Sequence, residues 1–121
     1  MSDEYPPADI AGIAAFGAVE IDNYLNGKDT RFENVQRLAG ILREYPVEEC
    51  FSYTPFLEAF GNKAGREMKT IPEVALEVKL FVMELECIPE DPERLKELRS
   101  ALCDISRGFL REAKSSYRAV A

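Results

Sequence analysis

Apolar residues recur along this chain at steps of three and four, the spacing of one face of a helix. The pattern is longest over residues 92–119, where Asp91 and Pro92 supply an N-cap acid and a proline at the first helical position. The opposite side carries basic residues within a sector of roughly 60°. We predict a long C-terminal helix that buries Leu95, Leu98, Leu102, Ile105, Phe109, Ala113 and Ser116 and presents a basic surface of Arg107, Arg111, Lys114 and Arg118, with Lys96 on the same side.

Further helices are predicted at residues 8–25, 30–45 and 70–87, with a turn at 47–53 followed by a short helix that Thr54 caps. Asn26-Gly27 and Pro46 end the first two, and Thr70 with Glu73 forms a capping box for the last. No strand-like alternation extends over four residues. The pattern therefore predicts one all-α domain over residues 1–121, a small, mainly antiparallel bundle of about four main helices plus one short helix, after a flexible leader at 1–7.

The predicted helix at 70–87 is unusual because it carries two apolar stripes. Val74, Val78, Phe81, Leu85 and Ile88 form one, and Leu76, Leu80, Met83 and Cys87 form the other, on the opposite side. A helix on the surface of a domain needs only one apolar face. Either this helix is sandwiched inside the bundle, or Leu76, Leu80 and Met83 form an interface with another chain.

Charge is distributed unevenly along the 121 residues. The net charge is −7, and residues 1–27 hold five acids and no base, whereas residues 94–121 hold seven bases and three acids. The overall charge repels nucleic acid and anionic membranes, which disfavours both as partners. The chain is best described as an acidic body with a basic final helix.

Three cysteines, Cys50, Cys87 and Cys103, lie far apart in the sequence and form no C-x-x-C motif. We expect reduced thiols, with Cys87 and Cys103 mostly buried. The first residues resemble no signal peptide, and the longest uncharged run is half the length of a membrane span. These features favour a cytoplasmic protein.

The sequence lacks the residues that most catalytic and metal sites need. It holds no histidine, and its dispersed cysteines cannot form a thiolate site. Glu73, Glu77 and Glu84 lie beside the apolar stripes and are typical of a solvated face. We therefore expect no catalytic residue, cofactor or bound metal. The glycine- and lysine-containing loop at 61–70 precedes a helix, so it is either an anion site or, as we favour, a connector.

Four aromatic residues gather within ten positions, at Phe51, Tyr53, Phe56 and Phe60. Aromatic side chains are common both in cores and at interfaces, and a segment that crosses a bundle would supply them to the core. We favour the core for most of the cluster. Tyr53 and Phe56 are the residues that we assign to a partner interface.

Together, these features predict a small protein-interaction module, an adaptor or regulatory subunit that acts through apolar helix faces and forms homodimers. The alternative is an acidic inhibitor or immunity-type protein that blocks a basic active site or a nucleic-acid-binding groove. Salt separates the two, because electrostatic binding weakens steeply with ionic strength and apolar binding does not. The basic surface of the final helix serves either solubility or an acidic partner.

Overall fold

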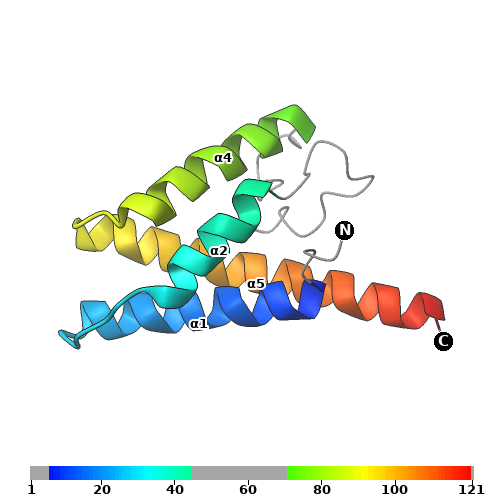
Figure 1. Ribbon diagram of the computed structural model, residues 1–121, viewed down its shortest axis with the longest axis horizontal. Coiled ribbons are helices and arrows are strands. Elements are labelled where there is room, and N and C mark those ends of the chain that lie inside the picture. The colour runs from blue at the N-terminus through cyan, green and yellow to red at the C-terminus, as the bar shows by residue number, and fades with distance from the viewer. Residues whose placement is uncertain (1–5, 45–70, 121) are drawn as a thin grey trace.

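The computed structural model of the chain describes residues 6–44 and 71–120, which form four helices and no strand. They are α1 (Pro7–Leu25), α2 (Glu33–Glu44), α4 (Ile71–Cys87) and α5 (Pro92–Val120), arranged as an all-α bundle (Figure 1). The all-α prediction is confirmed. The short helix predicted after residue 53, the loop at 61–69 and the first five residues of the leader lie outside the described residues.

α1 begins and ends where local chemistry favours it. Pro7, which we had placed in the leader, occupies the first helical position, where the missing N–H costs nothing. The helix ends at Leu25, and Gly27 follows in the left-handed region at φ 81° with its N–H donating to the Tyr24 carbonyl at 3.0 Å. The stop predicted at Asn26-Gly27 is confirmed, because glycine adopts this conformation without a steric penalty.

α2 begins three residues later than the pattern predicts. Phe32 has φ 58°, a left-handed conformation. A right-handed helix that began at Thr30 could not continue through this residue. Its side chain is buried, with its ring centroid 5.3 Å from that of Tyr24. The carboxylate of Glu20 on α1 then accepts hydrogen bonds from the backbone N–H groups of Asn34 and Val35, at 3.0 to 3.1 Å. A side chain from a neighbouring helix thus caps α2.

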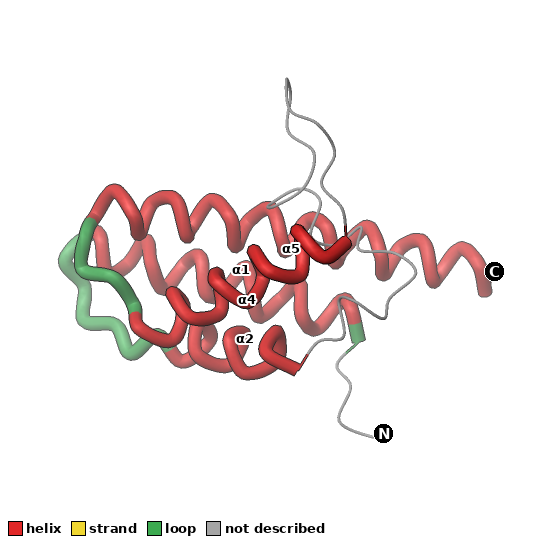
Figure 2. Tube along the Cα trace, turned by 90° about the horizontal axis from the view of Figure 1, so that it is seen from above, coloured by secondary structure: helices red, strands yellow, loops and turns green. Residues whose placement is uncertain are grey.

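The core lies where α1 packs against α5 and α2, and where α2 packs against α4. The inward stripe predicted for the C-terminal helix is buried from Leu95 to Phe109. Figure 2 shows that α5, 29 residues or about 43 Å long, extends past the other helices at its C-terminal end. The buried side chains with less than 2% exposure include Ile10, Ile21, Val35, Leu38, Leu85, Leu95, Leu98, Leu102, Ile105 and Phe109.

Three helices, α1, α2 and α5, come together at Gly17. A Cβ at this position would lie 3.3 Å from Cγ2 of Val35 on α2 and 3.5 Å from Cδ1 of Leu102 on α5. Nearby, the hydroxyl of Ser106 donates to the Ala11 carbonyl at 2.8 Å, which joins α5 to α1. The absence of a side chain at Gly17 therefore allows α1 to lie against both neighbours.

Substituting Gly17 with leucine should lower the free energy of unfolding by about 1 to 3 kcal/mol, since the new side chain overpacks a closed junction. Gly12 is the matched control: it lies on the same helix, and a Cβ there meets nothing within 4 Å. Gly12→Leu should be neutral or stabilising, because leucine favours a helix over glycine by roughly 0.5 to 1 kcal/mol. Urea denaturation of both variants measures the difference, and equal effects would contradict the packing argument.

Removing the Glu20 cap should destabilise the protein by about 1 kcal/mol, as loss of a helix N-cap does elsewhere. Glu20→Ala leaves the N–H groups of Asn34 and Val35 without this acceptor. Glu20→Gln retains an acceptor oxygen at the same reach and should keep most of the stability. Thermal denaturation of the two variants checks the prediction, which fails if the alanine variant is as stable as the wild type.

Candidate functional site

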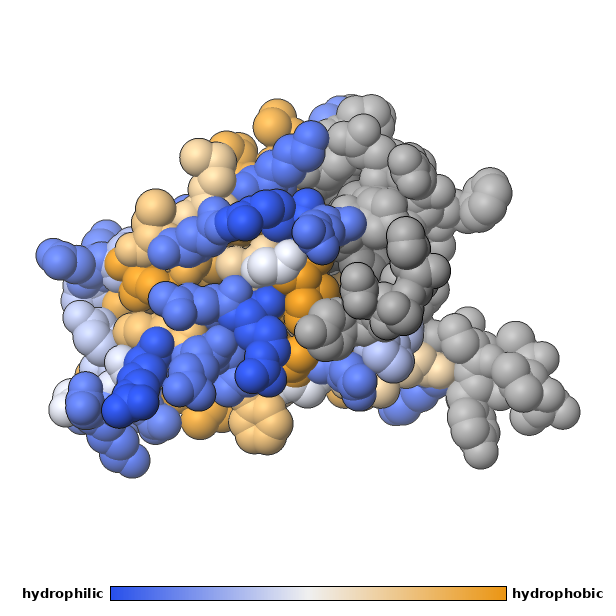
Figure 3. Space-filling view, in the orientation of Figure 1, coloured by the Kyte–Doolittle hydropathy of each residue, from blue (hydrophilic) through white to orange (hydrophobic). Residues whose placement is uncertain are grey.

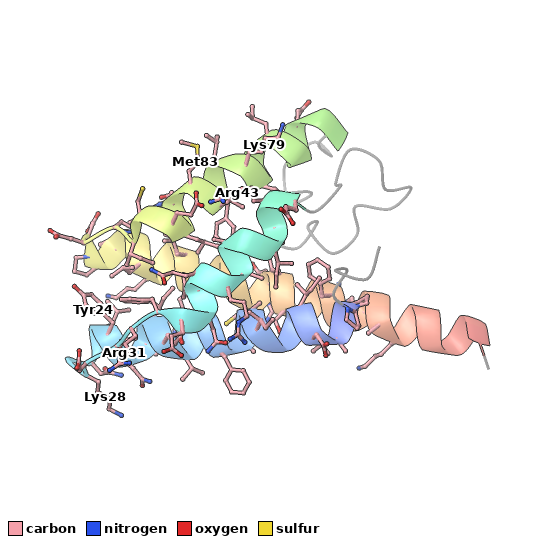
Figure 4. All side chains as sticks on the ribbon, in the orientation of Figure 1. Tyr24, Lys28, Arg31, Arg43, Lys79 and Met83 are labelled. Atoms are coloured by element: carbon pink, nitrogen blue, oxygen red, sulfur yellow. The ribbon has the colours of Figure 1, made fainter. Side chains whose placement is uncertain are left out.

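The outer side of α4 carries a row of exposed apolar side chains, which we call the α4 ridge: Leu76, Leu80 and Met83. They are 58%, 52% and 60% exposed, whereas Val78, Phe81 and Leu85 on the opposite side are buried. Apolar atoms line this edge of the molecule in Figure 3, and Figure 4 shows Met83 pointing away from the bundle. Among residues 6–44 and 71–120, no helix covers this side of α4, so α4 is not sandwiched between described helices.

Cys87 follows the ridge along the same side of the helix and is exposed, so our prediction that it is mostly buried is wrong. The reason is positional. Cys87 is the last residue of α4 and lies on the stripe that faces away from the core. Cys103 on α5 is partly buried.

A groove separates α4 from α5. The two helices diverge from the turn that joins them (Figure 1), and the space between them has a volume of about 460 Å³. Apolar side chains of Leu80, Phe81, Leu98 and Ala101 line it, together with Glu77, Glu84, Arg94, Glu97, Ser100 and Asp104. Four acids and one arginine give this groove a net negative charge.

Ion pairs organise the walls of the groove. Arg94 on α5 binds Glu84 on α4 through two hydrogen bonds, and its guanidinium also lies 3.5 Å from Glu97. The hydrogen bond to Glu84 raises the pKa of Arg94 above its ordinary value. On the other side of α4, Arg43 of α2 pairs with Glu86 (Figure 4). Arg94 thus holds two of the four acids, Glu84 and Glu97, in place.

The basic surface predicted on the final helix is exposed where its side chains are described, at Arg107, Arg111 and Lys114. Arg107 pairs with Asp104 one turn earlier. The last turns of α5 extend past the other helices (Figures 1 and 2), whereas Arg107 lies level with the bundle, next to Ser106, whose hydroxyl bonds to Ala11 of α1. The side chain of Arg118 lies outside the described residues.

A second apolar surface lies on α1, where Phe16 and Val19 are 63% and 52% exposed. It comprises two large exposed side chains, one fewer than the α4 ridge. Tyr53 and Phe56, the other residues that we assigned to a partner interface, lie outside the described ranges, as does the loop considered as an anion site.

Sequence reasoning identified the ridge but missed the groove. Glu77 and Glu84 on α4, and Glu97 and Asp104 on α5, each lie seven residues apart, which places each pair on one helix face. That spacing was a usable signal of two acidic faces. Periodicity does not show that these two faces lie opposite each other. Their relative position depends on how α4 and α5 pack.

The described residues show no site with evident chemistry. Within 6–44 and 71–120, no three Cys, Asp or Glu side chains lie close enough together to share a metal ion. No described helix has the length and apolar content needed to cross a membrane. What this part of the chain offers is surface: an apolar ridge, an acidic groove and a basic helix end.

Comparisons with known proteins add no relative. No protein-family model, curated protein or solved structure matches this chain.

Proposed function

We propose that this chain is a small protein-interaction module, an adaptor or regulatory subunit, that binds a partner protein through the α4 ridge. The observation that supports the proposal is the exposure of Leu76, Leu80 and Met83, each more than half exposed on one helix. Large apolar side chains gathered on one side of a monomer are typical of interaction sites. Their burial in a complex provides affinity without any catalytic chemistry.

The position of the ridge also suits recognition. Helix α4 keeps its inner side, with Val78 and Leu85, in the core, so the ridge is presented on a rigid element. Acids of the groove border it on one side, and the Arg43–Glu86 pair borders it on the other. An apolar centre with a charged rim is the usual composition of a protein interface.

The acidic inhibitor remains a second candidate because of the groove. Glu77, Glu84, Glu97 and Asp104 form a negatively charged channel with an apolar floor, which would suit a basic segment of a target enzyme. In this function, affinity comes from charge and falls as salt rises. Cytoplasmic location is part of both proposals.

Introducing charge on the α4 ridge should strongly weaken partner binding and leave the fold intact. In Leu80→Lys with Met83→Lys, the affinity for a captured partner should fall about tenfold or more, since central apolar contacts dominate interfaces. Both side chains are exposed, so the free energy of unfolding should change by less than about 0.5 kcal/mol each. Affinity capture from the native lysate, with mass spectrometry of the bound proteins, identifies the partner, and calorimetry with that partner measures the loss.

The matched control is Phe16→Lys with Val19→Lys on α1, which adds the same charge to the other exposed apolar surface. It should leave binding unchanged. Repeating the capture between about 0.05 and 0.5 M salt separates the two functions, since only binding in the acidic groove weakens strongly over that range. Loss of binding in the α1 variant, with none in the α4 variant, would assign the interface to α1 instead.

A further inference from the structure

The exposed side of α5 carries a heptad series that the proposed function does not use. Steps of four and three residues lead through Glu93, Glu97, Ser100, Asp104, Arg107, Arg111 and Lys114, and the next step in the sequence is Arg118. We call this series the α5 stripe. Its described side chains are exposed, apart from the partly buried Asp104. Residues at these steps lie along one face of the helix, so the series forms a continuous polar surface.

The charge of the α5 stripe reverses at its centre. Its first four positions hold three acids and a serine, and its last four hold only bases. Consider a second, antiparallel α5 helix related to the first by a two-fold axis that passes between residues 105 and 106. Each position of the stripe then faces another position of the same series. This arrangement pairs Glu97 with Lys114, Ser100 with Arg111, Asp104 with Arg107, and in the sequence Glu93 with Arg118.

We propose that two copies of the chain pair through antiparallel α5 helices, with the basic end of each helix lying along the acidic part of the other. The two-fold axis passes between residues 105 and 106, so that one surface serves both copies. In a parallel pair, acids would face acids and bases would face bases. The charge pattern therefore selects the antiparallel arrangement.

The surroundings of the stripe fit this occupant. Glu97, Ser100 and Asp104 line the groove, and Glu77 and Glu84 across it add to the negative charge that the basic helix end meets. The last turns of α5 extend past the other helices (Figure 2), and the described basic side chains of Arg107, Arg111 and Lys114 are exposed.

Contacts near the two-fold axis also fit. The pair formed by Arg107 and Asp104 within one chain remains intact, and its counterpart in the other copy completes a cluster of four charges. On one flank of the stripe, Leu110 is 44% exposed and comes opposite Cys103 of the second copy in this register. An apolar contact there explains why a leucine occupies an exposed position of α5.

This dimer goes beyond the proposed function because it uses α5 and leaves the outermost part of the α4 ridge uncovered. It also predicts a strong dependence on salt, since its contacts are mainly between exposed charges, which salt screens. Dimerisation through the α4 ridge would show no such dependence.

A charge exchange tests the pairing directly. Glu97→Lys places lysine opposite Lys114 in a homodimer, and Lys114→Glu places glutamate opposite Glu97. In sedimentation experiments at low salt and micromolar concentration, each single variant should self-associate about tenfold more weakly than the wild type. An equimolar mixture of the two variants should dimerise like the wild type, as should the double variant, because opposite charges then face each other again.

A cross-link tests the register. In a chain with Cys50→Ser and Cys87→Ser, Leu110→Cys should form a disulfide with Cys103 of the second copy under mild oxidation. Residues 103 and 110 of one helix are about 10 Å apart and cannot join. Dimers cross-linked from 103 to 110 support the proposal, whereas links only between equivalent cysteines would overturn it.

The remaining outcomes separate this proposal from the proposed function. A wild-type chain that stays monomeric at low salt, or single variants that a mixture does not rescue, would overturn the α5 dimer and leave partner binding by the ridge unaffected. A dimer that the Leu80→Lys, Met83→Lys variant abolishes and the charge variants do not would also overturn it, and would assign self-association to α4. Unchanged thermal midpoints confirm that each variant is folded.

Discussion

The contact between α1 and α5 at Gly17 is the constraint on which the other features of this bundle depend. Without a Cβ at Gly17, α1 approaches Leu102 on α5 and Val35 on α2 at the same level. Two polar contacts fix the position of α5 along the axis of α1. They are the Ser106–Ala11 hydrogen bond and the Arg99–Asp22 ion pair at 3.0 Å. Since α1 has 19 residues and α5 has 29, this register leaves the last turns of α5 extending past α1, and Arg111 and Lys114 follow the last buried residue, Phe109.

The groove follows from the same packing, through α2. Helix α2 lies against α1, and Glu20 of α1 caps its N-terminus. The left-handed backbone of Phe32 sets the direction in which α2 begins. Helix α4 then packs mainly on α2, and near the turn that connects α4 to α5, Arg94 bridges to Glu84. A small change in the start of α2 would therefore change the width of a groove that α2 does not line.

Periodicity was sufficient to predict the helices and the face that each one buries, because burial of an apolar stripe dominates the choice. It also identified the α4 ridge, since Leu76, Leu80 and Met83 fall on a second stripe that one small bundle does not cover. It failed where a tertiary contact overrides local preference. The late start of α2 depends on a carboxylate from another helix and on a buried Phe32 ring. The groove depends on packing between α4 and α5, and no pattern within one helix encodes that.

The two proposed surfaces, the α4 ridge and the α5 stripe, use different kinds of interaction. Apolar burial on the α4 ridge supplies affinity and has no preferred direction. Charge reversal along the α5 stripe favours one orientation of the two helices and makes their pairing dependent on salt. Within one chain, Leu76 and Met83 are exposed and do not line the groove, so an antiparallel α5 pair leaves them accessible in both copies. Such a dimer would present two equivalent ridges related by a two-fold axis. A partner that itself carries two binding segments would then be held far more tightly than by either ridge alone, because the second contact forms within the complex.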